Sequence, residues 1–255
     1  MPPSPVTERP PAGLPIVVLR GVGKTFERGT VALEALNLEV REGEFVSLLG
    51  PSGCGKSTVL RIIAGLSTAS GGFVEWPNGA GQISFVFQEP TLMPWTNVSG
   101  NVQLPLKLAK VDEKLSHAAV TQSLERVGLA DFTDAFPREL SGGMKMRASI
   151  ARALVTEPQL LLMDEPFAAL DEITRFKLNN DLLAVWHELR RTVIFVTHSV
   201  FESVYLSQRI VVMTPRPGRV FTEIAIDAPY PRDERFHTSI EYGSFCRQVA
   251  EALEK

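Results

Sequence analysis

The chain alternates short apolar runs with segments whose apolar residues recur at helical spacing. Apolar runs predict buried strands at residues 16–19, 36–40, 45–49, 83–87, 160–163, 192–196 and 209–213. Between about residues 98 and 150 the pattern is helical instead. The apolar positions expected on a helix face there are Leu115, Ala118, Ala119, Leu124 and Val127. Further helices are expected after Asp171 and after Ser199. Strands that alternate with helices indicate a parallel sheet covered on both faces.

The first fifteen residues differ from the rest because they are rich in proline and poor in large apolar side chains. Such a segment is expected to be an extended, poorly ordered tail. It lacks the apolar stretch of a signal peptide, and no apolar run anywhere reaches the roughly 18 residues of a membrane span. We therefore expect a soluble chain.

Composition limits the function only loosely. A chain of 255 residues can form one large domain or two small ones. The formal net charge of −3 gives no overall electrostatic reason to bind nucleic acid. The two cysteines, Cys54 and Cys246, make no disulfide framework, which favours a reducing compartment such as the cytoplasm.

One segment matches the nucleotide-binding pattern G-x-x-x-x-G-K-[ST] completely. Its residues are Gly50, Pro51, Ser52, Gly53, Cys54, Gly55, Lys56, Ser57 and Thr58. An apolar strand precedes it and an apolar helical pattern follows, which is the context that this phosphate loop requires. We expect its backbone N–H groups to surround phosphate oxygens, Lys56 to reach the β- and γ-phosphates, and Ser57 to bind Mg²⁺. Because Cys54 lies in this loop, its alkylation is expected to inhibit the protein, with protection by ATP.

Polar residues follow three further apolar strands. The strand at 160–163 is followed by Asp164 and Glu165, the strand at 83–87 by Gln88, and the strand at 192–196 by His198 after one intervening residue. Ligands of open α/β sheets bind at the carboxyl ends of strands. Asp164 is suited to hold Mg²⁺, directly or through water, and Glu165 to act as the general base toward an attacking water.

The segment from Leu140 to Arg147, which reads Leu-Ser-Gly-Gly-Met-Lys-Met-Arg, lies between the phosphate loop and the acidic strand end. Together these motifs resemble the nucleotide-binding subunits of ABC transporters, over about residues 16–217. The resemblance makes residues 140–147 the signature motif, Gln88 the Q-loop glutamine and a Mg²⁺ ligand, and His198 the switch histidine. It also places Asp171 in the D-loop and makes Phe26 the aromatic residue that stacks on adenine.

The resemblance implies an α/β fold: a P-loop NTPase core with a mostly parallel sheet, an antiparallel β subdomain and an inserted helical subdomain. The expected segments are a disordered tail at 1–15, a nucleotide-binding core with its β subdomain at 16–92 and 151–215, a helical signature subdomain at 93–150, and a C-terminal extension at 216–255.

The resemblance also implies an ATPase that uses ATP and Mg²⁺ and works as a head-to-tail dimer. In such a dimer Ser141, Gly142 and Gly143 cover the γ-phosphate bound to the other copy. Transmembrane permease subunits would be further partners, docking near Glu89 to Trp95, and a solute-binding protein an indirect one; nucleic acid is not expected. The location implied is the cytoplasmic face of the inner membrane.

Three features point to one branch of the family, the importers of nitrate, sulfonates and taurine. Met144 stands where the wider family most often has glutamine, and segments 213–219 and 228–232 are similar to that branch. Import of another solute and export stay open as alternatives. A soluble ABC ATPase acting on nucleic acid is disfavoured, since no long heptad run separates the phosphate loop from the signature. A small-molecule kinase would leave the signature unexplained.

Overall fold

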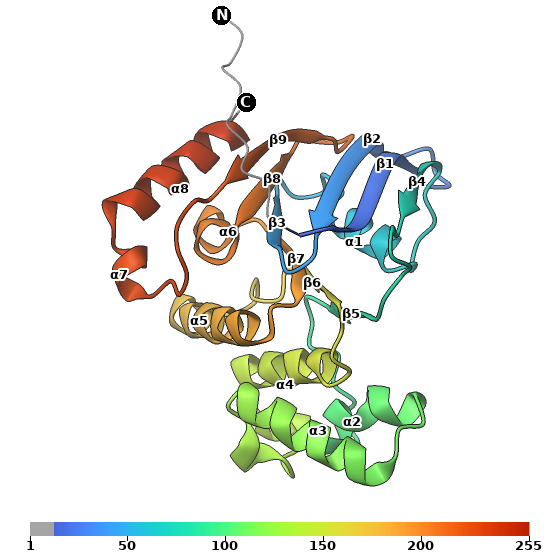
Figure 1. Ribbon diagram of the computed structural model, residues 1–255, viewed down its shortest axis with the longest axis vertical. Coiled ribbons are helices and arrows are strands. Elements are labelled where there is room, and N and C mark those ends of the chain that lie inside the picture. The colour runs from blue at the N-terminus through green and yellow to red at the C-terminus, as the bar shows by residue number, and fades with distance from the viewer. Residues whose placement is uncertain (1–12, 255) are drawn as a thin grey trace, which may run out of the picture. The chain divides into compact units, whose positions relative to one another are not determined.

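The computed structural model describes residues 13–254 (Figure 1). Most of the predicted N-terminal tail, residues 1–12, lies outside the described residues. The chain forms two compact units: the first contains the described residues up to 79 and from 192 onward, and the second contains residues 80–191. This partition differs from the segments expected from the sequence, whose boundaries stay a prediction.

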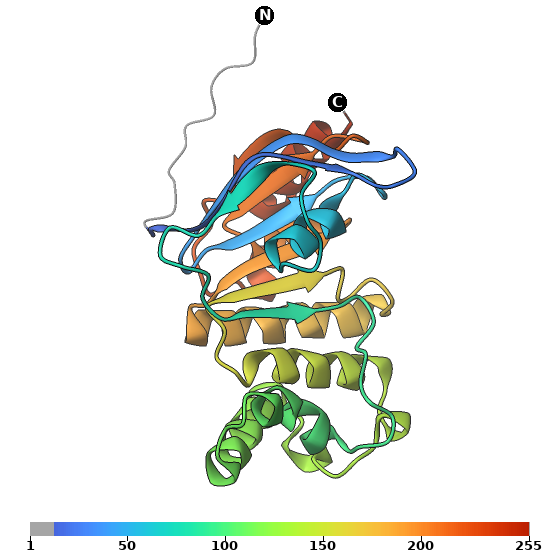
Figure 2. The same cartoon turned by 90° about the vertical axis from the view of Figure 1, so that its right-hand side faces the viewer.

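The first unit contains an antiparallel sheet in the order β2-β1-β4. Strand β1 (Pro15–Thr25) pairs with β2 (Val31–Arg41) and with β4 (Gly71–Glu75), and β1 and β2 form a long ribbon (Figure 2). In β2, Leu36, Leu38 and Val40 are buried while Asn37 between them is exposed, as expected of a strand with one face toward the core. This sheet is the predicted antiparallel β subdomain.

The first unit also contains a set of parallel strands with β3 at its centre. Strand β3 (Phe45–Leu49) pairs in parallel with β7 (Thr192–Thr197) on one side and with β8 (Arg209–Met213) on the other. Strand β9 (Val220–Ala225) runs antiparallel to β8. Every residue of β3 and β7 is buried, because helices α1 (Lys56–Ile63) and α6 (Val200–Leu206) lie on opposite sides of these strands (Figure 1).

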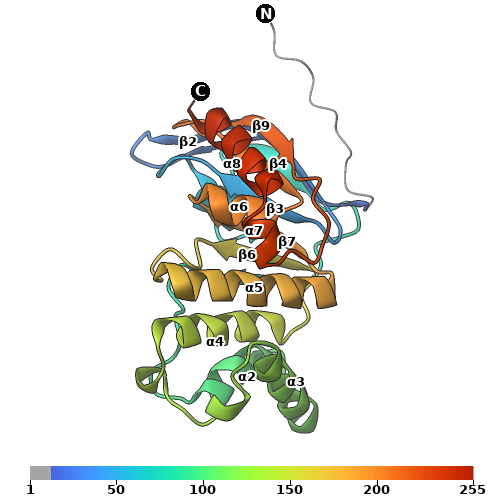
Figure 3. The same cartoon turned by 90° about the vertical axis from the view of Figure 1, so that its left-hand side faces the viewer.

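The end of the chain, which shows no clear pattern in the sequence, folds onto α6. Helices α7 (Glu234–His237) and α8 (Ile240–Leu253) lie beside it in Figure 3. The buried guanidinium of Arg232 donates to three carbonyl oxygens at the end of α6, those of Val204, Tyr205 and Ser207, at 2.9–3.0 Å. A cation at a helix C-terminus satisfies carbonyls that the helix leaves unpaired.

The second unit pairs two parallel strands, β5 (Ile83–Val86) and β6 (Leu160–Asp164), and contains four longer helices among its described residues. These helices are α2 (Val98–Leu108), α3 (Glu113–Arg126), α4 (Gly142–Leu154) and α5 (Glu172–Leu189), and short 3₁₀ turns cover Ala130–Phe132 and Pro137–Glu139. Helix α4 lies between α5 and the pair α2 and α3 (Figure 3). The predicted fold class, with its helical insertion, is confirmed.

One predicted helix face is correct only in part: Leu124 and Val127 are buried, but Leu115 and Ala118 are exposed. Leu115 on α3 is 66% exposed, whereas the buried residues of that helix are Ser116, Val120, Ser123 and Leu124. The helix packs through a face that includes two serines, and small side chains let neighbouring helices approach closely. Apolar spacing predicts a buried Leu115 and gives no sign that the two serines are buried.

Across residues 13–254, no helix has both the length and the apolar character needed to cross a membrane.

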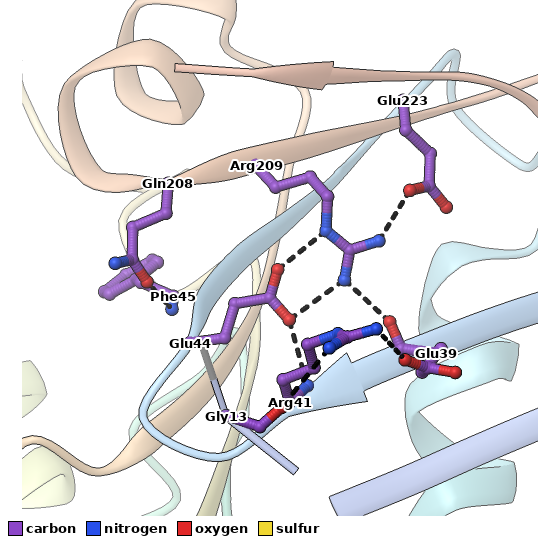
Figure 4. Close-up of polar contacts among 8 residues, drawn as sticks. All are labelled: Gly13, Glu39, Arg41, Glu44, Phe45, Gln208, Arg209 and Glu223. Carbon is purple, nitrogen blue, oxygen red and sulfur yellow. Dashed lines mark hydrogen bonds and ion pairs between the residues drawn. The ribbon is translucent and has the colours of Figure 1, made fainter. Parts of the chain in front are cut away.

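A buried ion pair joins the strands of the first unit (Figure 4). Glu44, directly before β3, is fully buried, and its two carboxylate oxygens accept from Arg209 at 2.6 and 2.9 Å. Arg209 also donates to Glu223 on β9 and to the Glu39 carbonyl of β2, both at 2.6 Å. Burial alone would lower the pKa of Arg209, but its bonds to Glu44 and Glu223 raise that pKa above the ordinary value.

Replacing Arg209 with methionine should destabilise the protein strongly, because Glu44 would be left buried without a counter-charge. We expect a loss of about 3–5 kcal/mol in the free energy of unfolding, measured by urea denaturation. The matched control is Arg20→Ala, which removes the exposed pair with Glu75 and should cost less than about 1 kcal/mol. The double change Arg209→Met with Glu44→Leu should recover part of the loss. Equal stability of Arg209→Met and the control would contradict this role.

Candidate nucleotide-binding site

The predicted phosphate loop connects β3 to α1. Gly53 and Gly55 have φ angles of +74° and +106°, which side-chain-bearing residues rarely adopt. A Cβ atom on Gly55 would also lie 2.6 Å from the Leu33 side chain. Helix α1 begins at Lys56 with no side chain capping its first turn. Such a helix N-terminus, approached through a glycine-rich loop, is suited to an anion.

Lys56 is buried and lies against the loop itself. Its Nζ donates to the carbonyl oxygens of Gly50 at 2.8 Å and Pro51 at 3.0 Å. In these two bonds the buried ammonium group has neutral carbonyl partners. Negatively charged phosphate oxygens would bind it more strongly than neutral carbonyls do, so Lys56 is well suited to exchange the one for the other.

Cys54, by contrast, does not present its thiol to solvent. Its side chain is 1% exposed, and its Sγ lies 3.9 Å from Lys56 Nζ. The expectation that alkylation at this residue inhibits the protein stays a prediction, and because the thiol is buried, a reagent can reach it only if the loop first opens. The sequence motif places Cys54 in the loop, but it does not predict the direction of the side chain.

Two other predicted residues belong to the same unit. Phe26 follows β1 and is 46% exposed, and Lys24 Nζ lies over its ring, 5.4 Å from the centroid. His198 is exposed between β7 and α6. Its neighbours fix the backbone there, since Ser199 N donates to Thr197 Oγ1 at 3.0 Å and the Thr197 hydroxyl donates to Glu202 at 2.5 Å.

In the second unit, the strand ends carry the predicted acidic residues and the glutamine. Val86 of β5 is in register with Met163 of β6, so the chain segments that follow leave the same edge of this strand pair. Asp164 is 7% exposed, and Gln88 is exposed. Glu165 has a φ of +47°, in the left-handed region that costs an ordinary residue about 1–2 kcal/mol. Strain of this kind gathers at functional sites.

The predicted signature begins helix α4. Ser141 is its N-cap, and its Oγ accepts from Met144 N at 3.3 Å. Gly142 is exposed, but Gly143 is buried, and a Cβ atom on Gly143 would lie 2.7 Å from the Thr174 methyl group of α5. Close packing of α4 against α5 therefore accounts for the second glycine.

Asp171 has a similar place at the start of α5. It is exposed, and its carboxylate accepts from Thr174 N at 3.0 Å. Hydrogen bonds from Thr174 lower the pKa of this carboxyl below its ordinary value, so Asp171 carries a negative charge near neutral pH.

Comparison with known proteins decides the family. The sequence profile of the family described as "ABC transporter" matches residues 33–168, just over half of the chain. This chain belongs to the ABC transporter family.

Several relatives are similar over most of their length. An ABC transporter ATP-binding protein of Methanocaldococcus jannaschii, MJ0412, is 47% identical over 227 residues, covering 87% of this chain and 84% of its own. The aliphatic sulfonates import ATP-binding protein SsuB 2 of Pseudomonas syringae pv. tomato is 47% identical over 212 residues, covering 83% and 88%.

Two solved structures of ABC proteins are similar to this chain over most of its length. The ATP-binding cassette MJ0796, described as a dimer in a post-hydrolysis state bound to ADP and Pi, superposes with a TM-score of 0.73 at 33% identity, covering 84% of this chain and all of its own. The cbiO1 protein of Clostridium perfringens, described as part of an ABC transporter complex, has a TM-score of 0.76 at 28% identity, covering 83% and 89%. The predicted activity and cofactors are confirmed: the protein is an ABC-type ATPase that uses ATP with Mg²⁺.

The residues of this ABC ATPase fit such a cofactor. Within residues 13–254 there is no group of three or more His, Cys, Asp or Glu side chains that could hold a metal by themselves. Mg²⁺ is commonly held by one or two protein oxygens together with substrate phosphates and waters. Ser57, in the first turn of α1, offers one oxygen of this kind in the first unit, and Asp164, at the end of β6, offers a carboxylate in the second.

Two residues of the ABC ATPase that sequence reasoning missed hold the segment after Gln88. Arg152 on α4 donates to the carbonyl oxygens of Pro90 and Thr91 at 2.8 and 2.9 Å. Asn101, fully buried on α2, bonds both the N–H and the carbonyl of Met93. Trp95 in this segment remains 76% exposed. The signal in the sequence is a polar side chain within an apolar helical pattern, which indicates a buried partner but not its identity.

Thiol labelling tests the burial of Cys54 in the ABC ATPase. Burial also raises the pKa of the Cys246 thiol, although a hydrogen bond with Tyr242 opposes the change. A buried thiol reacts slowly because the reagent cannot reach it, and a raised pKa slows Cys246 further. We therefore expect neither cysteine to react quickly with an aromatic disulfide reagent at pH 8 in the folded protein, and both to react in denaturant. The variants Cys54→Ser and Cys246→Ser assign each signal. Rapid stoichiometric labelling of Cys54 in folded Cys246→Ser would show that its thiol is accessible.

Proposed function

We propose that this ABC ATPase powers the uptake of a small anion, an alkanesulfonate or a related solute such as taurine or nitrate, through separate membrane subunits. The observation that carries the proposal is the identity of 46–47% to several aliphatic sulfonates import ATP-binding proteins, each over 83% of this chain. Met144 and the segment 213–219 support it as features of the same branch. The site of action proposed is the cytoplasmic face of the inner membrane.

The proposed reaction is the hydrolysis of ATP by water. The loop from Gly50 to Thr58 binds the phosphates through its N–H groups, with Lys56 on the β- and γ-phosphates, and the Phe26 ring stacks on adenine. Ser57, Asp164 and Gln88 would hold Mg²⁺, which neutralises charge on the phosphate oxygens. Glu165 takes a proton from the attacking water, and His198 donates a hydrogen bond to the γ-phosphate as charge develops there.

The working form proposed is a head-to-tail pair of two copies. Ser141, Gly142 and Gly143 of one copy would cover the γ-phosphate held by the other, with Asp171 nearby. The exposed Ser141 and Gly142 at the N-terminus of α4 suit this role, since a helix N-terminus attracts anions. The dimers described for MJ0796 support the arrangement.

The proposed contact with the permease subunits is the segment from Glu89 to Trp95, and a solute-binding protein would act on the far side of those subunits. Trp95 is a large side chain left mostly exposed, as expected at a protein interface. Arg152 connects this segment to α4, which carries the signature at its other end. A change at the signature can thereby reach the permease through one rigid helix.

Replacing Glu165 with glutamine tests its role as the base. The variant should bind ATP with an affinity near that of the wild type, while its turnover falls by at least about a hundredfold, because only the proton acceptor is lost. ATP should also hold it as a dimer in size-exclusion chromatography. Lys56→Ala should lose both binding and turnover, and Glu172→Gln, a change at an exposed glutamate, should change neither. Normal turnover in Glu165→Gln would assign the base to another group.

Uptake by cells tests the proposed solute. Cells whose only copy of this protein carries Lys56→Ala should lose uptake of one labelled solute among an alkanesulfonate, taurine and nitrate, compared with the wild type. Selective loss would identify the cargo. Unchanged uptake of all three, with the variant protein present at normal levels, would contradict the proposal and favour another solute or export.

A further inference from the structure

The turn between β8 and β9 is organised by its own hydrogen bonds. Thr214 N donates to the Arg219 carbonyl at 3.0 Å, the Thr214 hydroxyl donates to the Pro217 carbonyl at 3.1 Å, and Arg219 N donates to that hydroxyl at 3.0 Å. One threonine thus connects the two ends of the turn. The turn, residues 214–219, therefore has a definite shape before any neighbour is considered.

The same turn lies directly against the phosphate loop. A Cβ atom on Gly218 would lie 2.0 Å from the Cys54 carbonyl oxygen, so no other residue fits there without a shift of the backbone. Gly218 N also donates to the Ala32 carbonyl at 2.9 Å, and Glu34 N donates to the Gly218 carbonyl at 3.1 Å. The turn is thereby fixed between β2 and the loop, all within the first unit.

From this fixed turn, one exposed arginine reaches the loop. Arg216 donates from Nε and Nη2 to the Gly53 carbonyl oxygen, at 3.2 and 3.1 Å. Gly53 is the first of the two loop glycines with a positive φ. A loop that turns its N–H groups toward an anion must turn carbonyl groups elsewhere, and those carbonyls need donors of their own. Lys56 holds the carbonyls of Gly50 and Pro51, and Arg216 holds the carbonyl of Gly53, two residues further along the loop.

We propose that Arg216 is a positioning residue for the phosphate loop, which holds the Gly53 carbonyl so that the neighbouring N–H groups face the nucleotide phosphates. The inference rests on the proposed assignment of residues 50–58 to phosphate binding, and not on the transported solute. It assigns a function to the turn, which the sequence alone marks only by its resemblance to one branch of the family.

The test compares Arg216→Ala and Arg216→Lys with Arg219→Ala. Arg219 lies in the same turn and carries the same charge, but it pairs with the exposed Glu34 and bonds no loop carbonyl through its side chain. Binding of ATP with Mg²⁺ to the full chain is measured by calorimetry, and steady-state hydrolysis gives KM and kcat. Hydrogen exchange of residues 52–55 is measured without nucleotide.

We expect Arg216→Ala to raise the Kd and the KM for ATP about five- to tenfold, which is what one charge-assisted hydrogen bond contributes. Its kcat at saturating ATP should stay within about twofold of the wild type, because the loop is restored once nucleotide is bound. Exchange of the loop amides should quicken about fivefold. Arg216→Lys should recover most of the affinity through one remaining bond, and Arg219→Ala should match the wild type in all three measurements.

Salt separates positioning from simple attraction between charges. The effect of Arg216→Ala should persist at about 0.5 M salt, where attraction between separated surface charges is largely screened. An effect that vanished in salt, a Kd within about twofold of the wild type, or unchanged exchange at residues 52–55 would each overturn the proposal. If the wild-type chain bound no ATP, the assignment of residues 50–58 would fail instead, while the exchange measurement would still report whether Arg216 restrains the loop.

Discussion

The structure of the first unit depends on how strand β3 is held. All five of its residues are buried, its neighbours β7 and β8 run parallel to it, and the phosphate loop begins at its carboxyl end. At its other end, the fully buried Glu44 is bonded through both oxygens to Arg209, which also bonds β2 and β9. A buried charge is tolerated only when it is paired and its hydrogen bonds are satisfied. The pair therefore fixes the start of β3, and with it the point from which the loop departs.

The shape of the loop depends on partners for both its N–H groups and its carbonyl groups. Glycines at 53 and 55 allow the backbone to turn N–H groups to one side, and two cations, Lys56 and Arg216, hold carbonyls of the loop. In the proposed site, the loop releases Lys56 to the phosphates and must still keep its shape. A second cation on a fixed turn meets that requirement, since its bond to Gly53 does not compete with the nucleotide for Lys56.

Much of this was predictable from the sequence, because the decisive signals are local. Predominantly apolar runs predicted β3, β6, β7 and β8, and the loop motif and the signature predicted the family that the comparisons confirm. Contacts between distant residues were not predictable. The buried face of α3 was predicted only in part, because two serines belong to it. The turn that packs against the Cys54 backbone lies more than 150 residues further along the chain. Arg152, Arg216 and Arg232 each bond backbone carbonyls, which carry no side-chain signal at all.

The central claim is that residues 50–58 hold the phosphates of ATP, and a crystal structure of the chain with Mg²⁺ and a non-hydrolysable ATP analogue tests it most directly. The account predicts phosphate oxygens at the N–H groups of this loop, Lys56 Nζ moved from the carbonyls of Gly50 and Pro51 to the β- and γ-phosphates, and Arg216 still bonded to Gly53. A nucleotide bound elsewhere, with Lys56 Nζ still on those carbonyls, would contradict it.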